Sequence, residues 1–572
     1  MLESKLNITE EEERLHLEFI KDELTNAIKE IEKLVRSKYE EVIDQKRYLS
    51  ESKADKDHVE KVSVRQSIEQ MASVGEHILS KKKRLLKLIN SPYFGRIDFS
   101  TNGEAYRTPI YIGIHNFVDT EDENNLIYDW RAPISSMFYD FELGLAYYDA
   151  PEGEIVGKIY LKRQYRIEHG KMKFMLESSV NIIDDVLQKE LSKSSDEKMK
   201  NIVATIQRDQ NAIIRNEKSS VLVIQGAAGS GKTSIALHRI AFLLYKFKDT
   251  ISSKDILIIS PNKVFADYIS NVLPELGEES IQETSMENLA DEIFRHQIKF
   301  QTFFEQVAHL LEKNDQKFVD RIRFKSSSEF LKKLDEYIRH LKRKNLNAVR
   351  IKQSRYFVPA WFIEERFKMY NRIPIDKQIT NVVNDIVENV KIEFNYEIKG
   401  NERNEIRKEL KKMFRTTNLR VLYKEFYNWL GKPEMLKLAK GSVYEYADVY
   451  PLIYLKIRLE GAAKYDKVKH LVVDEMQDYT PVQYRVIARL FNCKKTILGD
   501  SNQSVNPFSS STAESISEIF PNADKMYMNK SYRSTIEITE FAQQIHRNDN
   551  LEPIERHGEK PMKKNSSMMR MN

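Results

Sequence analysis

The sequence has only one cysteine, Cys493, in 572 residues. A single cysteine cannot form a disulfide within the chain, and it excludes zinc sites built on several cysteines. This scarcity is typical of proteins in a reducing compartment, so we expect a cytoplasmic protein. No apolar run reaches the roughly 20 residues that cross a bilayer, and the N-terminus lacks the basic start and apolar core of a signal peptide. We therefore expect no membrane segment and no membrane partner.

Neither sign of charge is in large excess. The formal net charge is +5, whereas charged residues make up 31% of the chain. So small a net charge says little about partners, and local clusters of charge are more informative. The length predicts several domains of about 100–200 residues each, and the 41% hydrophobic content is enough for ordinary cores.

The first 90 residues predict two long antiparallel helices. Thr9 and Glu12 have capping-box spacing, and apolar residues then follow a heptad pattern at Leu17, Ile20, Leu24, Ala27, Ile31 and Leu34. A second helical run extends from about Val59 to Ile89, and polar SESKADKDH lies between the two. This connection is either a solvated turn or the tip of an arm that inserts into a partner, with Asp55, Asp57 and Glu60 as its acidic residues.

The pattern changes to β structure after residue 90. TPIYIGI alternates strictly and predicts a strand with Ile110, Ile112 and Ile114 on one face. KIYLKRQYRIEHGKMKFMLE predicts a hairpin with its turn near His169 and Gly170. In YDWRAPISSMFYDF we interpret Trp130 as a core residue, and we find no catalytic constellation in this region.

The stretch SSVLVIQGAAGSGKTSIALHRI contains the pattern G-x-x-x-x-G-K-[ST] between an apolar strand and a helix. Glycines in such a loop let backbone N–H groups surround phosphates at the positive end of a helix. Lys232 is predicted to reach the β- and γ-phosphates of ATP, and Thr233 to give its hydroxyl to Mg²⁺. The predicted ATP-binding loop comprises Gly226, Ala227, Ala228, Gly229, Ser230, Gly231, Lys232, Thr233 and Ser234.

Further apolar strands end in polar residues. VKHLVVDEMQDYT places Asp474, a candidate Mg²⁺ ligand, and Glu475, a candidate base for the attacking water, after a buried strand. KKTILGDSNQSV ends with Gln503, a candidate sensor of the γ-phosphate, and DILIISPNK is another strand. Strands that alternate with helices predict an α/β fold with a parallel sheet and the ligand at the carboxyl ends of its strands.

These motifs, together with SYRS near the C-terminus, resemble the UvrD/Rep/PcrA group of superfamily 1 helicases. The resemblance implies that Gln210 reads the adenine edge and that Gln477 links the nucleotide to the neighbouring motor domain. It implies that Tyr532 stacks on adenine and that Arg533 reaches the γ-phosphate from a second motor domain, a role that suits the planar guanidinium. It also implies single-strand contacts, and therefore DNA as a possible ligand, at Asn262, Lys263, Thr284 and Phe508.

The segment from 291 to 450 is helix-rich and separates the early motifs from Asp474. Its stretch RHLKRKNLNAVRIKQSRY has seven Lys and Arg residues and no acid, and aromatic residues follow in YFVPAWFIEERFKMY. This composition favours either binding to nucleic acid or an anionic protein channel, or solvated helix faces over a core that includes Trp361 and Phe362.

A narrower resemblance covers nearly the whole chain. The two-helix arm, SPYFGRIDF, YDWRAPISS, KRQYRI and IVATIQRDQN are similar to HelD-type proteins of Gram-positive bacteria. The resemblance implies binding to RNA polymerase, with the arm in the secondary channel, the insertion in the primary channel, and ATP linked to release of stalled polymerase. It also implies that the tip acids approach the polymerase active-site Mg²⁺ and that the protein is a monomer outside the complex.

The predicted fold is α/β, with a RecA-like P-loop NTPase domain, a helical-hairpin arm, a small β-rich domain, a helical insertion and an incomplete second RecA-like domain. After IERHGEKP the sequence ends in polar MKKNSSMMRMN. We expect motifs V and VI of the family to be missing, as in a truncated gene, and therefore weak or absent ATP turnover. In order, the expected parts are the arm at 1–90, the β-rich domain at 91–180, the first motor domain at 181–290 and 451–520, the insertion at 291–450, the start of the second motor domain at 521–560 and a disordered tail at 561–572.

Three functions fit this sequence. The first is an ATPase motor that binds RNA polymerase and releases it from stalled complexes. The second is a DNA helicase that unwinds in the 3′-to-5′ direction. The third is a nonenzymatic polymerase-binding protein, which the expected loss of the late motifs favours over the first. The arm favours the polymerase-binding functions over the helicase.

Overall fold

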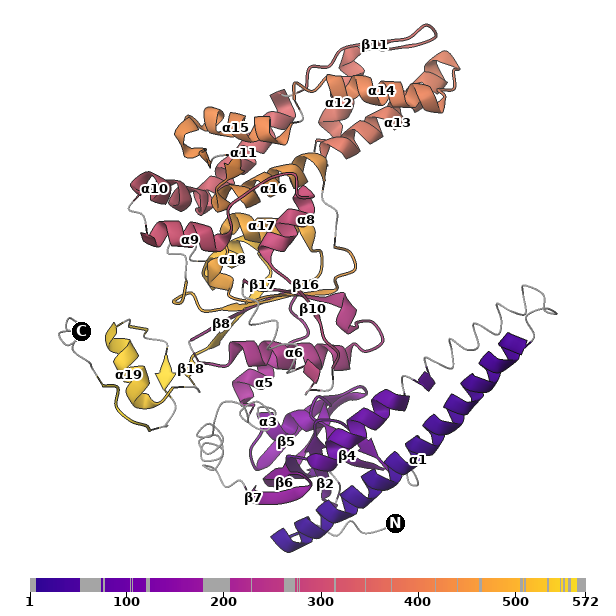
Figure 1. Cartoon of the computed structure of the whole chain (residues 1–572), viewed down its shortest axis with the longest axis vertical. Coiled ribbons are helices and arrows are strands. Elements are labelled where there is room, and N and C mark those ends of the chain that lie inside the picture. The colour runs from indigo at the N-terminus through magenta and orange to yellow at the C-terminus, as the bar shows by residue number, and fades with distance from the viewer. Residues whose placement is uncertain are drawn as a thin grey trace.

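The computed structural model describes three large connected parts of the chain and a small unit after them (Figure 1). We name the three large parts the N-terminal module, residues 7–177; the parallel-sheet domain, built around residues 206–294 and 465–528; and the helical insertion, residues 303–460. The structure describes residues 7–562 except 52–73, 76–77, 103, 105, 120–123, 178–205, 228, 262–272, 275, 277, 313–314, 345, 372, 417, 440, 462–464, 505–507, 509–510, 532–533, 546, 549–550 and 554–556.

The N-terminal module consists of two helices and a curved sheet. The helices are α1 (Glu10–Glu51) and a second helix at 78–90, which together we call the arm. The sheet has the order β3-β4-β2-β1-β6-β5, with β7 also paired to β6. Its elements are β1 (Gly95–Thr101), β2 (Thr108–Gly113), β3 (Phe117–Val118), β4 (Asn125–Asp129), η1 (Ile134–Ser136), α3 (Met137–Asp140), β5 (Gly144–Ala150), β6 (Gly153–Glu168) and β7 (Lys171–Glu177).

Local predictions for this module are largely confirmed. The Glu12 N–H donates to Thr9 Oγ1 over 3.2 Å, and the Thr9 N–H donates to Glu12 Oε2 over 2.8 Å, which completes the capping box. The hairpin turn lies at His169 and Gly170, whose φ angles are 51° and 70°. The predicted heptad stripe is buried up to Ile31, whereas Leu34 is 45% exposed and the neighbouring Val35 packs against the same core instead. The tip acids Asp55, Asp57 and Glu60 lie outside the described residues.

The sheet of the N-terminal module is buried on both faces, not on one. Ile110 and Ile112 face the parallel-sheet domain, as the alternation predicts. Tyr111, on the opposite face, is 4% exposed because the arm covers it. We call these the nucleotide face and the arm face of the sheet.

The parallel-sheet domain has six parallel strands in the order β10-β9-β15-β16-β8-β17. Both of its faces are buried: Leu222 and Ile224 pack on the side of α5 and α6, and Val221 and Val223 pack on the side of α8 and α17. The elements are α5 (Arg208–Ile214), β8 (Val221–Gly226), α6 (Lys232–Lys246), η3 (Ser253–Asp255), β9 (Ile256–Ile259), β10 (Gln282–Thr284), α8 (Met286–Phe294), β15 (His470–Val473), η5 (Met476–Asp478), α17 (Pro481–Leu490), β16 (Lys494–Gly499), α18 (Ala513–Ile519) and β17 (Ala523–Met528).

The strand β17 belongs to this sheet, although the sequence placed residues from 521 onward in a second motor domain. Ala523 to Met528 pair in parallel with Val221 to Gly226 of β8, which satisfies the backbone groups at that edge. A separate small unit follows and lies to one side in Figure 1, with β18 (Lys530–Ser531), α19 (Ile536–Ile545) and β19 (Glu552–Pro553).

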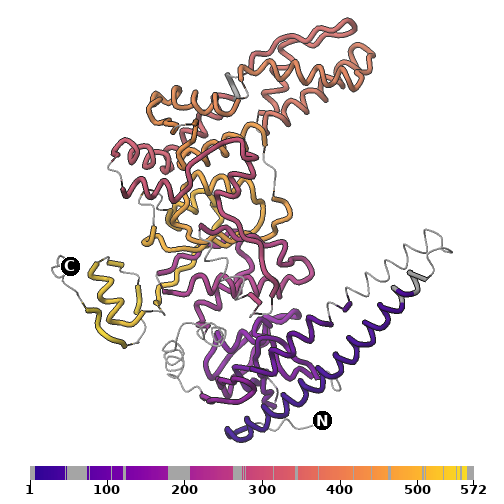
Figure 2. Tube along the Cα trace, in the orientation of Figure 1, coloured from indigo at the N-terminus to yellow at the C-terminus, as the bar shows by residue number. Residues whose placement is uncertain are grey.

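The helical insertion leaves the sheet after α8 and returns before β15, as the chain trace in Figure 2 shows. Phe362 is buried, but Trp361 is 65% exposed, so the predicted core at this point includes only the phenylalanine. No helix in the described part of the chain is both long and apolar enough to cross a membrane. The insertion comprises α9 (Phe303–Glu312), α10 (Gln316–Lys325), α11 (Ser328–Lys344), β11 (Ile351–Lys352), β12 (Phe357–Val358), α12 (Ala360–Met369), α13 (Ile375–Phe394), α14 (Gly400–Lys412), α15 (Leu419–Leu430), η4 (Pro433–Met435), β13 (Leu438–Ala439), β14 (Val443–Tyr444) and α16 (Tyr446–Glu460).

Candidate nucleotide-binding site

The phosphate loop joins β8 to α6 at the carboxyl edge of the parallel sheet. Gly229 and Gly231 have φ angles of 75° and 83°, a left-handed backbone that favours glycine. Gly226 is required by space: a Cβ there would lie 2.6 Å from Ser230 Oγ and 2.7 Å from Lys232 Cγ. The loop therefore closes tightly over the start of α6, whose N–H groups and helix dipole favour an anion.

Two side chains of the loop point into this turn. Lys232 Nζ donates to the carbonyl oxygens of Gly226 and Ala227 over 2.9 and 3.0 Å. Ser230 is fully buried, and its Oγ has no hydrogen-bond partner among the described residues. A phosphate oxygen would satisfy such a hydroxyl, so the loop suits the group that the sequence predicts for it.

The acidic pair follows β15, which lies two strands from β8 in the sheet. Asp474 is only 5% exposed. The pKa of its carboxyl is raised to about 7, chiefly by burial and then by the Glu475 carboxylate, whereas the Lys232 ammonium lowers it. Glu475 has a left-handed φ of 50°, which is uncommon for a residue with a side chain. A bound cation or phosphate-bound metal would stabilise the ionised form of this buried carboxyl.

Gln477 connects the acidic pair to the end of β16. Its Nε2 donates to Glu475 Oε2 over 2.6 Å, and its Oε1 accepts from the Asp500 N–H over 2.9 Å. Gly499 allows this contact, because a Cβ there would lie 2.4 Å from Gln477 Oε1. Gln503 Nε2 donates to Asp500 Oδ2 over 2.9 Å. The structure thus brings three predicted residues, Glu475, Gln477 and Gln503, into one hydrogen-bonded set.

Asp500 and Gln225 were not among the predicted residues, yet they complete this set. Asp500 is 2% exposed, and it accepts from Gln503 and from Gln225 Nε2, the latter over 3.3 Å. The sequence contained a signal for Asp500, since it is the first polar residue after the apolar strand TILG. Gln225 was hidden because it lies inside the strand β8, where a polar residue does not change the pattern.

Gln210, the predicted adenine reader, lies on the short helix α5 and forms a capping box. Its Oε1 accepts from the Gln207 N–H over 3.1 Å. Arg239 of α6 donates to the carbonyl oxygens of Ile213 and Ile214 over 2.9 and 3.2 Å. These bonds fix the end of α5 against the helix that follows the phosphate loop.

The remaining predicted residues are less closely grouped. Thr233 lies in the first turn of α6, and the Ser234 carbonyl contacts His238 Nδ1 at 2.6 Å. Thr284 ends β10, and its Oγ1 donates to the Ser285 carbonyl over 3.4 Å. The Phe508 ring is partly covered by the Arg323 guanidinium of the insertion, 5.1 Å from its centroid. Outside the described residues lie Ala228, Asn262, Lys263, Tyr532 and Arg533, whose roles stay predictions.

Comparisons with known proteins agree with this geometry. Residues 206–524 match the family described as UvrD/REP helicase N-terminal domain, and residues 10–195 match the one described as DNA helicase IV HelD, N-terminal domain. The ATP-dependent DNA helicase PcrA of Staphylococcus epidermidis is 24% identical over 358 residues, 61% of this chain and 40% of that protein. The PcrA of Staphylococcus aureus is 24% identical over 352 residues, 60% of this chain and 40% of the relative.

A shorter match extends to another helicase. The ATP-dependent DNA helicase UvrD2 of Mycobacterium tuberculosis is 32% identical over 85 residues, 14% of this chain and 12% of that protein. The chain spans about two fifths of the length of the PcrA proteins that it matches. The family match, by contrast, covers more than half of this chain and includes the phosphate loop, the acidic pair and Gln503. The chain therefore belongs to the UvrD/REP helicase family and carries a HelD-type N-terminal domain.

Proposed function

We propose that this chain is an ATPase motor that binds RNA polymerase and couples ATP to the release of polymerase from stalled complexes. The family implies an ATP-dependent helicase-type motor, and the HelD-type domain is what points to polymerase. One observation carries the proposal: the sheet of the N-terminal module packs against the arm on one face, and on the other it shares an apolar core with α3, α5 and α6. The arm is thus connected through the sheet and α3 to the helices that flank the phosphate loop.

In the proposed site each residue has a distinct task. Lys232 contacts the β- and γ-phosphates, and Glu475 orients and deprotonates the attacking water. Gln503 senses the γ-phosphate, and Gln477 links it to Glu475 because it contacts that carboxylate and the backbone of Asp500. Tyr532 and Arg533 would complete the site from the second motor domain.

Thr233 and Asp474 are the residues proposed to hold Mg²⁺. Hydroxyl and carboxylate oxygens are ligands that Mg²⁺ prefers, and the buried Asp474 carboxyl would be stabilised as a carboxylate by the ion. Among the described residues no group of three or more His, Cys, Asp or Glu side chains could hold a metal, so nucleotide phosphates and water would supply the other ligands. When bound, the ion neutralises phosphate charge during transfer.

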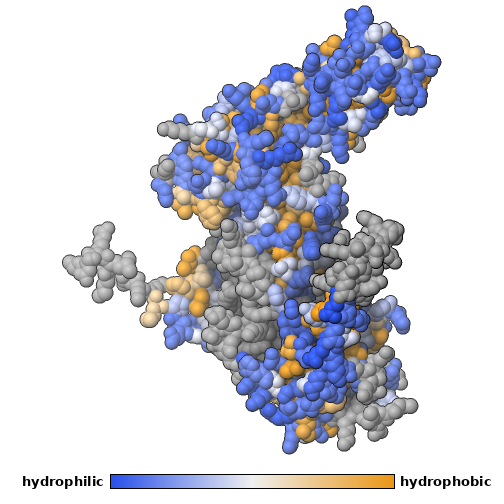
Figure 3. Space-filling view, turned by 45° about the vertical axis from the view of Figure 1, so that its right-hand side comes forward, coloured by the Kyte–Doolittle hydropathy of each residue, from blue (hydrophilic) through white to orange (hydrophobic). Residues whose placement is uncertain are grey.

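The arm tip and the outer end of the insertion are the proposed contacts with polymerase. We place Asp55, Asp57 and Glu60 near the polymerase active-site Mg²⁺ in the secondary channel. The insertion would enter the primary channel, and its exposed apolar residues Trp361, at 65%, and Ile392, at 75%, support a contact surface there. Figure 3 shows hydrophobic side chains scattered over an otherwise hydrophilic surface at that end.

The test is co-purification with RNA polymerase combined with an ATPase assay on the same sample, with Lys232→Ala as the matched variant. We expect both proteins to retain polymerase, and only the unmodified chain to hydrolyse ATP and release polymerase from stalled complexes. Loss of polymerase from both preparations, or equal hydrolysis by both, would contradict the proposal. The triple change Asp55→Asn, Asp57→Asn and Glu60→Gln tests the tip acids. If the triple variant affects transcription in the same way as the parent, these acids do not act at the polymerase active site.

A second candidate function is 3′-to-5′ DNA unwinding, and the PcrA relatives are named as ATP-dependent DNA helicases. Phe508 favours it, because an aromatic ring stacks on a base with about 1–3 kcal/mol per base. Arg323 already covers one side of that ring, 5.1 Å from its centroid. In anisotropy titrations with single-stranded DNA, Arg323→Ala should bind more tightly and Phe508→Ala more weakly. Unwinding without any polymerase association would replace the first function by this one.

A further inference from the structure

None of the roles described above involves the motif YDWRAPISSMFYDF. It forms the end of β4, the turn η1 and the short helix α3. Trp130 is fully buried, as its interpretation as a core residue predicts, and its surroundings include the nucleotide-binding helices. We call residues 129–140 the WR segment.

The WR segment is bonded to the end of the helix that carries Gln210. Arg215, which follows α5, donates to the Trp130 carbonyl over 2.7 Å and to the Arg131 carbonyl over 3.0 Å. The same guanidinium donates to Asn211 Oδ1 over 3.0 Å. One arginine therefore ties two residues of the WR segment to one residue of α5.

A second contact joins the same two elements. Asn211 Nδ2, one residue beyond Gln210, donates to Asp140 Oδ1 over 2.7 Å. Asn211 is only 1% exposed, so water competes little for this bond. Asp140 accepts from Asn211 Nδ2 and Arg215 donates to Asn211 Oδ1, so both polar atoms of this side chain are bonded. Because α5 has only seven residues, these bonds restrict its orientation.

The WR segment also contacts α6, which begins with Lys232. The rings of Trp130 and His238 meet edge to face with centroids 5.6 Å apart, and the Arg131 guanidinium lies 4.8 Å from the centroid of the Tyr245 ring. Asp129 holds Arg131 by two bonds of 2.7 and 2.8 Å. The segment therefore contacts both helices next to the predicted ATP site, and it belongs to the module that carries the arm.

We propose that the WR segment sets the base selectivity of the nucleotide site, with Arg215 and Asp140 as positioning residues that hold α5 and hence Gln210 in place. The inference rests on the proposed role of Gln210 in reading adenine. The phosphate loop binds the phosphates through its own backbone and Lys232, so Arg215 and Asp140, which bond to α5, affect recognition of the base and not of the phosphates. The N-terminal module is then part of the adenine pocket's support as well as the base of the arm.

The test compares nucleotide affinities of the full chain and its variants, with fluorescent ATP and GTP analogues and with inorganic tripolyphosphate as competitor. Asp140→Ala removes one hydrogen bond of a charged group and should lower affinity for ATP by about tenfold. Arg215→Ala removes three hydrogen bonds and should lower it by at least as much. In both variants the preference for ATP over GTP should become smaller, while the affinity for tripolyphosphate stays the same. Asp140→Asn keeps an oxygen that accepts from Asn211, so it should retain most of the preference.

Two controls separate the possible failures. Asp98→Ala removes a charged pair from the opposite, arm face of the same sheet and should leave the ATP preference unchanged, even if stability falls. Gln210→Ala should abolish the preference; if it does not, both the adenine role and this inference are overturned. If Gln210→Ala abolishes the preference and the Arg215 and Asp140 variants retain it, the inference alone is wrong. Equal losses for ATP and tripolyphosphate would also overturn it.

Discussion

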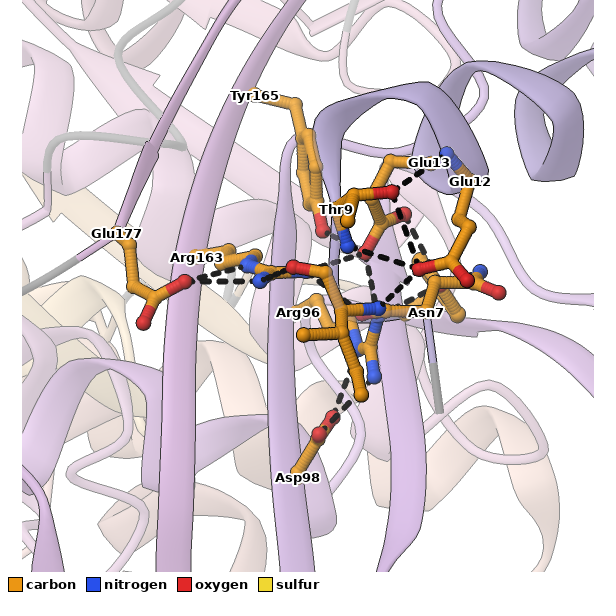
Figure 4. A network of polar contacts seen from close by, with 11 residues as sticks. Asn7, Thr9, Glu12, Glu13, Arg96, Asp98, Arg163, Tyr165 and Glu177 are labelled. Carbon is orange, nitrogen blue, oxygen red and sulfur yellow. Dashed lines mark hydrogen bonds and ion pairs between the residues drawn. The ribbon is translucent and has the colours of Figure 1, made fainter. Parts of the chain in front are cut away.

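The two faces of the N-terminal sheet are buried by different chemistry. The nucleotide face shares a core of aliphatic and aromatic side chains with α3, α5 and α6, to which it contributes Ile97, Phe99 and Ile112. The arm face adds a cluster of charges, in which Glu13 of α1 meets Arg96 and Arg163 of the sheet (Figure 4). Apolar contact is non-directional, whereas charged hydrogen bonds need defined positions. We infer that the charged cluster fixes the direction of the arm, whereas the apolar nucleotide face joins the module to the helices beside the phosphate loop.

The charged side chains of the cluster on the arm face are buried and hydrogen-bonded to one another. Glu13 and Arg96 are both 0% exposed, and Asp98 holds Arg96 by bonds of 2.7 and 2.9 Å. Arg163 donates to Glu13 over 3.1 Å and to the Asn7 carbonyl over 2.8 Å, so it also holds the segment that precedes α1. Removing one member leaves the others buried without compensation, which costs more than the pair itself contributes.

The largest effect should come from Glu13→Ala. It leaves Arg96 and Arg163 buried with fewer acceptors, so we expect a loss of about 3–5 kcal/mol in the free energy of unfolding of the module. Urea denaturation measures this loss, and limited proteolysis should cut the arm first. Glu13→Gln keeps two hydrogen-bonding atoms and should lose less. A Glu13→Ala protein as stable as the parent would show that the arm is held by its apolar stripe alone.

The next effect tests the nucleotide face. Ile97 is fully buried there, and Ile97→Ala should cost about 3 kcal/mol through lost contacts and a residual cavity, whereas Ile97→Val should cost about 1 kcal/mol. Because this core is shared with α5 and α6, ATP affinity should fall together with stability. The Glu13 variant should keep its ATP affinity. If both variants change ATP affinity alike, the two faces do not differ in the way proposed here.

Local patterns predicted the elements but not this difference between the faces. The capping box at Thr9, the phosphate loop and the strand before Asp474 are visible because their residues are neighbours in sequence. Glu13 and Arg163 are 150 positions apart, and neither stands out in its own segment. The alternation in TPIYIGI predicted one buried face correctly, but it could not show that the arm covers the other.

In the candidate site, too, residues within local motifs were predicted, and residues whose partners are distant in sequence were not. Motifs predicted Lys232, Asp474, Glu475 and Gln503, which lie at the ends of the strands as expected. Asp500 is bonded to residues from two other strand ends, so its importance depends on the order of strands in the sheet. The place of β17 was missed for a similar reason, since an edge strand with exposed lysine and aspartate carries only a weak pattern.

A smaller effect should appear in the pH dependence, since the pKa of several histidines is lowered, among them His16, His115, His238 and His470. Burial lowers the pKa of His16, on the arm, and of His238, on α6, to about 4 in each case. Above pH 6.5 both imidazoles are neutral in the folded and in the unfolded chain, so they do not lower the free energy of unfolding there. As the pH falls from about 6.5 to 4 the unfolded chain takes up protons first, so stability is lost, by up to about 3 kcal/mol for the fully buried His238.

Thermal denaturation between pH 7 and pH 4 measures this loss. His238→Leu should flatten the decline more than His16→Phe, because His16 is only partly buried and water can solvate its charge, whereas His238 is buried. Parallel curves for both variants and the parent would mean that other groups cause the acid sensitivity. If His16→Phe flattened the decline more than His238→Leu, the expected order of the two effects would be wrong.

The smallest effect should come from an ion pair within the arm itself. Lys82 Nζ lies 2.7 Å from Glu32 Oε1 and joins the two arm helices beyond their buried stripe, with side chains 29% and 53% exposed. Water and salt screen such a pair, so Glu32→Gln should change neither the midpoint of unfolding nor the protease sensitivity of the arm by a resolvable amount. Comparing Glu32→Gln with Glu13→Ala shows whether an exposed ion pair stabilises the arm as much as a buried one. A clear loss of stability from Glu32→Gln would mean that exposed pairs along the helices, and not the buried cluster at their base, hold the arm in its direction.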